Sequence, residues 1–179
     1  MEQGGENLYN FVFNDPLVLI DILGLNPMGP VIVPAHQGTN CAGTAIFPNH
    51  VGAGGQAQYV PSPDNMITPS GENNEDGTPG AGCREVSGAS DCKTEKPDCE
   101  RHVIIYIPLI DSWDSGGGAP NYHAIGQNNC GGSYIHQTGS NGDIRGPVPD
   151  PSAAARAYYD TLEDPRPLIE THYCCPNDQ

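Results

Sequence analysis

Residues 102–109 read HVIIYIPL, and this stretch decides the fold because its apolar run is continuous and rich in β-branched residues. Such a run is typical of a strand that is buried on both faces, so we predict a central strand here. Two further strands are expected in NYHAIG (121–126) and SYIHQ (133–137), joined by the Gly-rich turn QNNCGG. LIETHYCC (168–175) predicts a last strand.

Two segments carry the signals of a helix start. QGTNCAGTAIF (37–47) places Thr39 and Asn40, which are good N-cap residues, before a run of small residues. DPSAAARAYYDTL (150–162) has Asp at the cap and Pro in the first turn. Residues 49–100 are rich in Gly, Pro, Asn, Asp and Ser, which predicts a long surface loop. The predicted fold is α+β, a small antiparallel sheet with one or two short helices and long Gly/Pro-rich loops.

The chain of 179 residues is strongly acidic, with a formal charge of −15. Tight nucleic-acid binding depends on Lys and Arg that neutralise phosphates, so we expect no nucleic-acid partner. No polybasic or amphipathic segment indicates a membrane surface, and we expect no membrane partner either. An acidic surface is compatible with a basic protein partner. The seven basic residues are scattered: Arg84, Lys93, Lys96, Arg101, Arg145, Arg156 and Arg166.

The opening segment NLYNFVFNDPLVLIDILGL (7–25) differs in character from everything that follows. It lacks the basic start of a secretory signal, and Asp15 and Asp21 interrupt the apolar run that a membrane span requires. Asn14-Asp15-Pro16 has turn chemistry, which predicts two strands joined at this point.

The same segment resembles the end of an Rhs (YD-repeat) core, and the match covers residues 6–25. It rests on Asn-Leu-Tyr at 7–9, on Asn-Asp-Pro at 14–16, and on the sequence Asp-Ile-Leu-Gly-Leu at 21–25. The resemblance implies a large β shell that cleaves itself after its final Leu and encloses a C-terminal toxin.

On this resemblance, Asp21 and Leu25 mark the self-cleavage site, with Ile22 standing where the family has Pro. Residues 1–25 are then the end of the Rhs core, a remnant of the shell, and residues 26–179 form the toxin or effector domain. The resemblance implies a secreted protein that is delivered into a target cell in interbacterial competition. Its expected partners are the encapsulating Rhs shell and a cognate immunity protein.

Seven cysteines leave at least one thiol free if the others pair. Cys174 and Cys175 are adjacent, and because neighbouring cysteines rarely bond to each other, we expect them to reach other segments. Disulfides indicate an oxidising compartment at some stage. The chain has no Cys-x2–4-Cys spacing typical of structural zinc, so we expect disulfides rather than a metal, and no cofactor.

A candidate nucleophile and base can be named from position. Cys41 stands at a predicted helix start, where backbone N–H groups lower a thiol pKa, and His123 on a predicted strand is the candidate base. Gln37 is the candidate donor to an oxyanion. His136 lies thirteen residues after His123 in the next strand. Adjacent antiparallel strands would place both imidazoles on one sheet face, with His136 orienting the base or contacting substrate.

NYHAIGQNNCGGSYIHQTGS, together with the helix at 150–162 and the paired-cysteine tail, resembles a domain common at the C-termini of Rhs-type and other bacterial proteins. The Cys-then-His order is similar to that of papain-like thiol hydrolases. Gln127 and Tyr122 are the candidate substrate-binding residues, and Gln127, like His136, could instead orient the base. Asn121 stands where the pattern usually has the Asp of a Cys-His-Asp triad. The positions that match the pattern are Asn40, Cys41, Tyr122, His123, Gln127, His136 and Gly139.

The sequence therefore predicts a Cys-His thiol hydrolase or transferase, which would be a peptidase, deamidase or amidase acting on a protein or peptide substrate. Two other hypotheses stay open. A non-enzymatic, disulfide-stabilised binding domain would use Cys41 as a half-cystine. A zinc-dependent hydrolase would use His36, Cys41 and His123 as ligands.

Overall fold

The computed structural model describes part of the chain. The predicted strands of residues 7–25 and the proposed self-cleavage residues Asp21 and Leu25 lie outside the described part, as do Gln37 and His36. The described residues are 26–34, 38–46, 66–69, 71–75, 77, 80–88, 99–109, 122–127 and 129–176.

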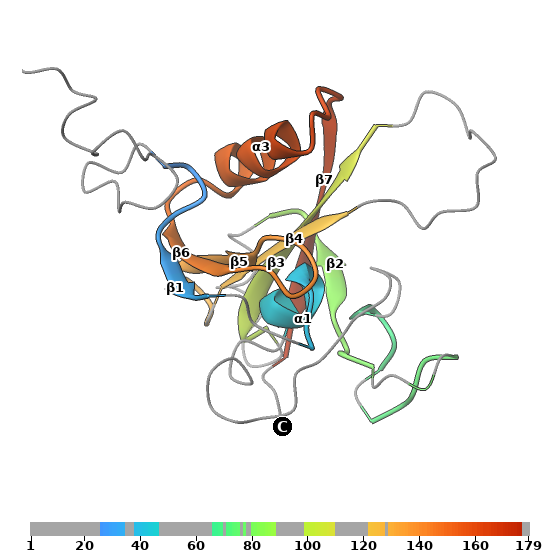
Figure 1. Cartoon of the computed structure of the whole chain (residues 1–179). Coiled ribbons are helices and arrows are strands. Elements are labelled where there is room, and N and C mark those ends of the chain that lie inside the picture. The colour runs from blue at the N-terminus through green and yellow to red at the C-terminus, as the bar shows by residue number, and fades with distance from the viewer. Residues whose placement is uncertain are drawn as a thin grey trace, which may run out of the picture.

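An antiparallel sheet of seven strands forms the centre of the described residues (Figure 1). Neighbouring strands follow the order β1-β6-β5-β4-β3-β7-β2. Together with two helices, this sheet confirms the predicted α+β class. The strands are β1 (Val31–Val33), β2 (Arg84–Val86), β3 (Arg101–Pro108), β4 (His123–Gln127), β5 (Tyr134–Gln137), β6 (Ile144–Val148) and β7 (Leu168–Cys175).

β3 occupies the interior of the sheet, as its continuous apolar run predicts. It pairs with β4 on one side and with β7 on the other, and its residues 101–106 are all buried. The predicted strands β4, β5 and β7 are confirmed. The prediction of an unbroken loop over 49–100 is wrong, because residues 84–86 form β2 against β7.

The two helices begin where their cap residues stand. The Asn40 side chain accepts a hydrogen bond from the Gly43 N–H at 2.9 Å at the start of α1 (Cys41–Ile46). The Asp150 side chain accepts from Ser152 and Ala153 at the start of α3 (Pro151–Thr161). These side chains satisfy backbone N–H groups that lack a partner in the first helical turn, which explains both starts.

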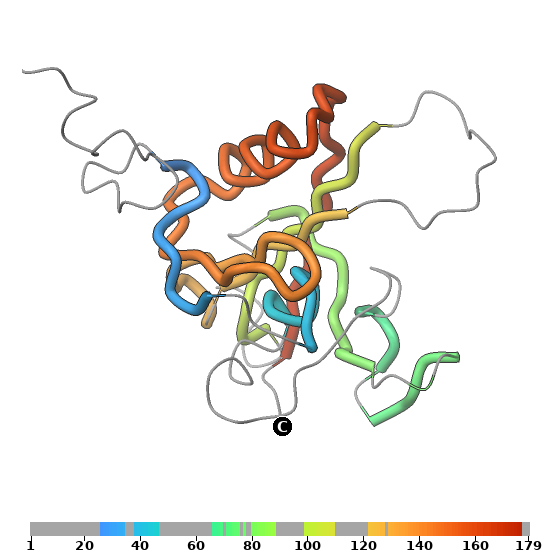
Figure 2. Tube along the Cα trace, viewed as in Figure 1, coloured from blue at the N-terminus to red at the C-terminus, as the bar shows by residue number. Residues whose placement is uncertain are grey.

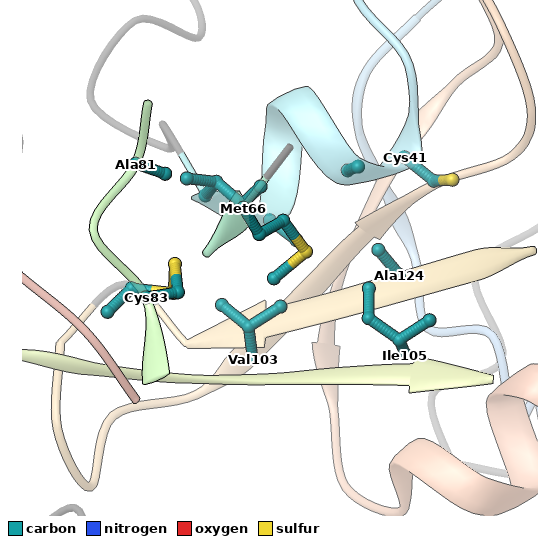
Figure 3. Close-up of a cluster of buried hydrophobic side chains, with 11 residues drawn as sticks. Cys41, Met66, Ala81, Cys83, Val103, Ile105 and Ala124 are labelled. Atoms are coloured by element: carbon teal, nitrogen blue, oxygen red, sulfur yellow. A yellow bond between two sulfur atoms is a disulfide. The ribbon is translucent and has the colours of Figure 1, made fainter. Parts of the chain in front are cut away.

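Side chains alternate between the two faces of the sheet, and each face has its own helix. Val103 and Ile105 of β3 pack with Ala124 of β4 and the buried residues of α1 (Figure 3). Ile104 and Tyr106 of β3 pack with Ile125 of β4 and with α3. Because successive residues of a strand point to opposite faces, α1 and α3 cover opposite faces of β3 and β4.

Disulfides attach the end of β7 to two different segments. Cys175 bonds to Cys83, and the adjacent Cys174 bonds to Cys99. This confirms that the vicinal cysteines reach elsewhere, since neighbouring strand residues point to opposite faces. Cys130 is disulfide-bonded as well. Among the described cysteines, Cys41 is the one with a free thiol. No described helix is long and apolar enough to span a membrane.

Candidate functional site

The structure brings His123 and His136 together inside the protein. Both side chains are completely buried, and His123 Nε2 lies 2.8 Å from His136 Nδ1. The sheet register explains the contact: His136 is the partner of Ile125, and Ile125 is two residues after His123 on the same face. The two imidazoles therefore meet on the face that α3 covers.

Hydrogen bonds fix where the protons of this pair lie. His136 Nε2 is 2.8 Å from the backbone oxygen of Met28, which can only accept, so this nitrogen carries the proton. A neutral imidazole has one N–H, and His136 Nδ1 must therefore accept from Nε2–H of His123. His123 Nδ1 is then unprotonated, and it is buried without a hydrogen-bond partner among the described residues.

Electrostatics keep both rings neutral. Burial lowers the pKa of His136 to about 4, despite a bond to Met28 that acts in the opposite direction. Burial, and then the charge of His136, lower the pKa of His123 well below its ordinary value. Each ring is a neutral imidazole at pH 7, and His123 Nδ1 is an available base.

Cys41 belongs to α1 and contacts the backbone on either side of His123, whose ring lies on the face that α3 covers. Its Sγ donates to the backbone oxygen of Tyr122 at 3.7 Å and contacts the backbone of Ala124, the residues immediately before and after His123. Figure 3 shows the sulfur at the start of α1, directed away from Met66.

The thiol is protonated in this arrangement. Burial raises the pKa of Cys41 to about 11, because the loss of solvation outweighs the hydrogen bonds from the backbone of Ala124 and Ala42. The expectation that the helix start lowers this pKa is wrong for the resting protein: α1 has six residues and all of them are buried. The site therefore holds a neutral thiol and a neutral imidazole.

Two tyrosines of α3 enclose the histidine pair. The Tyr158 ring stacks on His123 with centroids 4.0 Å apart, and Tyr159 approaches His123 edge-on at 6.5 Å. Tyr159 also donates to the backbone oxygen of Tyr106. Burial raises the pKa of both Tyr158 and Tyr159, and the charge of a Cys41 thiolate would raise each of them further. Neither tyrosine was predicted at the site, although Tyr158 follows Ala154 at helical spacing on the face of α3 that packs on the sheet.

The remaining predicted site residues make local contacts. Asn40 Nδ2 lies 3.3 Å from the Tyr122 hydroxyl, which links the start of α1 to the start of β4. Gln127 is buried at the other end of β4, where its side-chain oxygen accepts from Gly131 N and closes the turn to β5. The structure thus places Gln127 away from His123 along the strand.

A second histidine pair occupies the same face. His172 Nε2 is 2.7 Å from Glu170 Oε1, and His172 Nδ1 is 3.0 Å from His102 Nε2. On its other side, His102 Nδ1 is 2.7 Å from the Tyr134 hydroxyl. His102 and His172 come together because β3 pairs with β7, a contact between segments far apart in the sequence. Glu170 and His172 are two residues apart in a predicted strand and therefore lie on the same face, and this spacing was the sign of their contact in the sequence.

Metal binding has no support from the described residues, among which no group of three or more His, Cys, Asp or Glu side chains could hold a metal ion. The half-cystine role of Cys41 is contradicted, because its thiol is free. No family model, curated protein or solved structure matches this chain.

Proposed function

We propose that residues 26–179 form the C-terminal toxin domain of an Rhs-type protein and act as a Cys-His thiol hydrolase or transferase. Two observations carry the proposal: His123 Nδ1 is buried without a hydrogen-bond partner among the described residues, and the free thiol of Cys41 contacts the backbone on either side of His123. A buried polar atom without a partner costs free energy, and such atoms cluster at functional sites. The substrate class is an amide of a protein or peptide, as in a peptidase, deamidase or amidase.

The chemistry follows from the two neutral groups. His123 Nδ1 takes the thiol proton as Sγ of Cys41 attacks the carbonyl carbon, so the S–C bond forms while the C=O bond becomes an oxyanion. The C–N bond then breaks, and the His123 imidazolium returns its proton to the departing amine. Water hydrolyses the resulting thioester, or an acceptor amine takes the acyl group. His136 holds the His123 ring throughout by accepting from Nε2–H.

Three features support the proposal that the domain is a toxin carried by an Rhs shell. The segment at 6–25 resembles an Rhs core end, disulfides are typical of exported proteins, and the acidity suits a basic immunity protein. In this proposal the Rhs shell and the immunity protein are the partners, and Asp21 and Leu25 mark the separation of the toxin from the shell.

Growth of bacteria that produce the domain in the cytoplasm or in the periplasm tests the proposal. Wild type is compared with Cys41→Ala, His123→Ala and the control His172→Gln, which changes a histidine outside the site. We expect wild type and the control to arrest growth in at least one compartment, and both site variants to be harmless while they retain their circular dichroism spectra.

Folded site variants that arrest growth as well as wild type would refute the thiol mechanism. If no protein arrests growth in either compartment, the toxin assignment fails. A mass-spectrometric search for an acyl group on Cys41 provides an independent readout, since the thioester intermediate adds mass at this residue only.

A further inference from the structure

Residues 26–30 supply the acceptor for the outer N–H of the histidine pair, because the backbone oxygen of Met28 accepts from His136 Nε2. We propose that this segment is a positioning element: its Met28 carbonyl selects the tautomer of His136 and thereby leaves Nδ1 of His123 as the base. The catalytic use of that base rests on the proposed function, whereas the choice of tautomer does not.

Local bonds make the segment a defined turn. The Asn26 side-chain oxygen accepts from Met28 N at 3.1 Å, and the Asn26 backbone oxygen accepts from Gly29 N at 3.0 Å. Gly29 has a φ of 74°, a left-handed conformation that favours glycine. This turn aims the Met28 carbonyl at His136.

Contacts with β6 then hold the turn against the sheet. Gly146 N donates to Pro30 O at 2.9 Å, and Arg145 Nη1 donates to Gly29 O at 3.3 Å. Beyond the turn, β1 pairs with β6, and Figure 2 shows this N-terminal part of the tube running beside the strands of the sheet. The approach is close, because a Cβ on Gly29 would lie 2.8 Å from the backbone oxygen of Pro147.

The carbonyl matters because an imidazole pair has two proton arrangements. With an acceptor at His136 Nε2, each ring carries its proton on Nε2 and His123 Nδ1 is bare. Without that acceptor, His136 can carry its proton on Nδ1 and donate to His123 Nε2, and the proton of His123 moves to Nδ1. A base with a proton on Nδ1 cannot accept the proton of Cys41. The turn therefore determines which nitrogen is the base.

The test replaces Gly29 by Ala in the full chain. Gly29→Ala brings a Cβ against Pro147 and displaces the Met28 carbonyl. Gly71→Ala is the matched control, because Gly71 has a φ of 89° but nothing within 4 Å of its added Cβ. Asn26→Ala is a milder second variant that removes the bond to Met28 N without adding bulk. The readouts are the imidazole ¹⁵N shifts, which report the tautomers, and the rate at which iodoacetamide alkylates Cys41 at pH 7.

We expect wild type and Gly71→Ala to show a single Nε2–H tautomer at His123 and His136. Gly29→Ala and Asn26→Ala should show mixed tautomers, and iodoacetamide should alkylate their Cys41 at least about tenfold more slowly. This factor is smaller than the full contribution that a general base usually makes to a rate. A Nδ1–H tautomer of His136 in wild type would overturn the inference, as would unchanged tautomers in both folded variants. If Cys41→Ala proves fully toxic while the tautomers behave as expected, the proposed function fails and the positioning role stands.

Discussion

Gly126→Ala tests the contact that places Cys41 beside β4. A Cβ at this position would lie 2.3 Å from the backbone oxygen of Ala45 and 2.8 Å from its Cα. Both are backbone atoms of α1, a wholly buried helix, so the helix as a unit must move away from the sheet. Overpacking of this kind costs about 1–3 kcal/mol. A chain of this size loses roughly 2–4 °C of Tm per kcal/mol, which predicts a fall of roughly 2–12 °C.

The same shift changes the chemistry, because Cys41 is the first residue of α1. Moving the helix lengthens the bond from Sγ to Tyr122 O and opens the thiol to reagents. We therefore expect iodoacetamide to alkylate Cys41 faster in folded Gly126→Ala than in wild type. Gly88→Ala is the control, since its added Cβ has nothing within 4 Å, and we expect it to stay within about 0.5 kcal/mol of wild type.

Thermal unfolding followed by circular dichroism gives the first readout, and mass spectrometry of the alkylated peptide gives the second. A Tm for Gly126→Ala that matches the Gly88→Ala control, with equal alkylation, would refute the proposed packing of α1 on β4. A lower Tm with an unchanged alkylation rate would refute only the expectation that moving α1 exposes the Cys41 thiol to iodoacetamide.

Three further outcomes are expected. Because burial raises the pKa of Cys41 from 9.0 to about 11, iodoacetamide should alkylate Cys41 at pH 7 about 100-fold more slowly in the folded protein than in the unfolded chain; equal rates in the two states would contradict this. Burial lowers the folded pKa of His136 to about 4, so its contribution to stability is complete above about pH 6.5 and declines as pH falls towards 4; urea unfolding from pH 7 to 4.5 should show this decline, and His136→Gln should flatten it. Replacing Cys99 and Cys174 together by Ala opens a loop closed over a separation of 75 residues and should lower the free energy of unfolding by up to about 4 kcal/mol; Cys41→Ala, which breaks no disulfide, should cost less in the same thermal assay.

The sequence predicted the elements whose signals are local. β3 has a continuous apolar run, and α1 and α3 have cap residues that satisfy their first N–H groups. β2 and β6 were not predicted. β2 is three residues long inside a Gly- and Pro-rich stretch, and β6 contains Gly146 and Pro147, which interrupt any strand pattern. Such strands form because a neighbouring strand offers them hydrogen bonds, which no short window of sequence reveals.

By itself, the sequence determined that Cys41 begins a helix and that His123 and His136 share one face of adjacent strands, because cap chemistry and strand alternation act over a few residues. Only the tertiary structure decided the rest of the site. The Met28 carbonyl fixes the tautomers, α3 covers the pair, and burial raises the thiol pKa instead of lowering it. Each of these depends on desolvation or on a contact between segments far apart in the chain, so only the folded protein sets them.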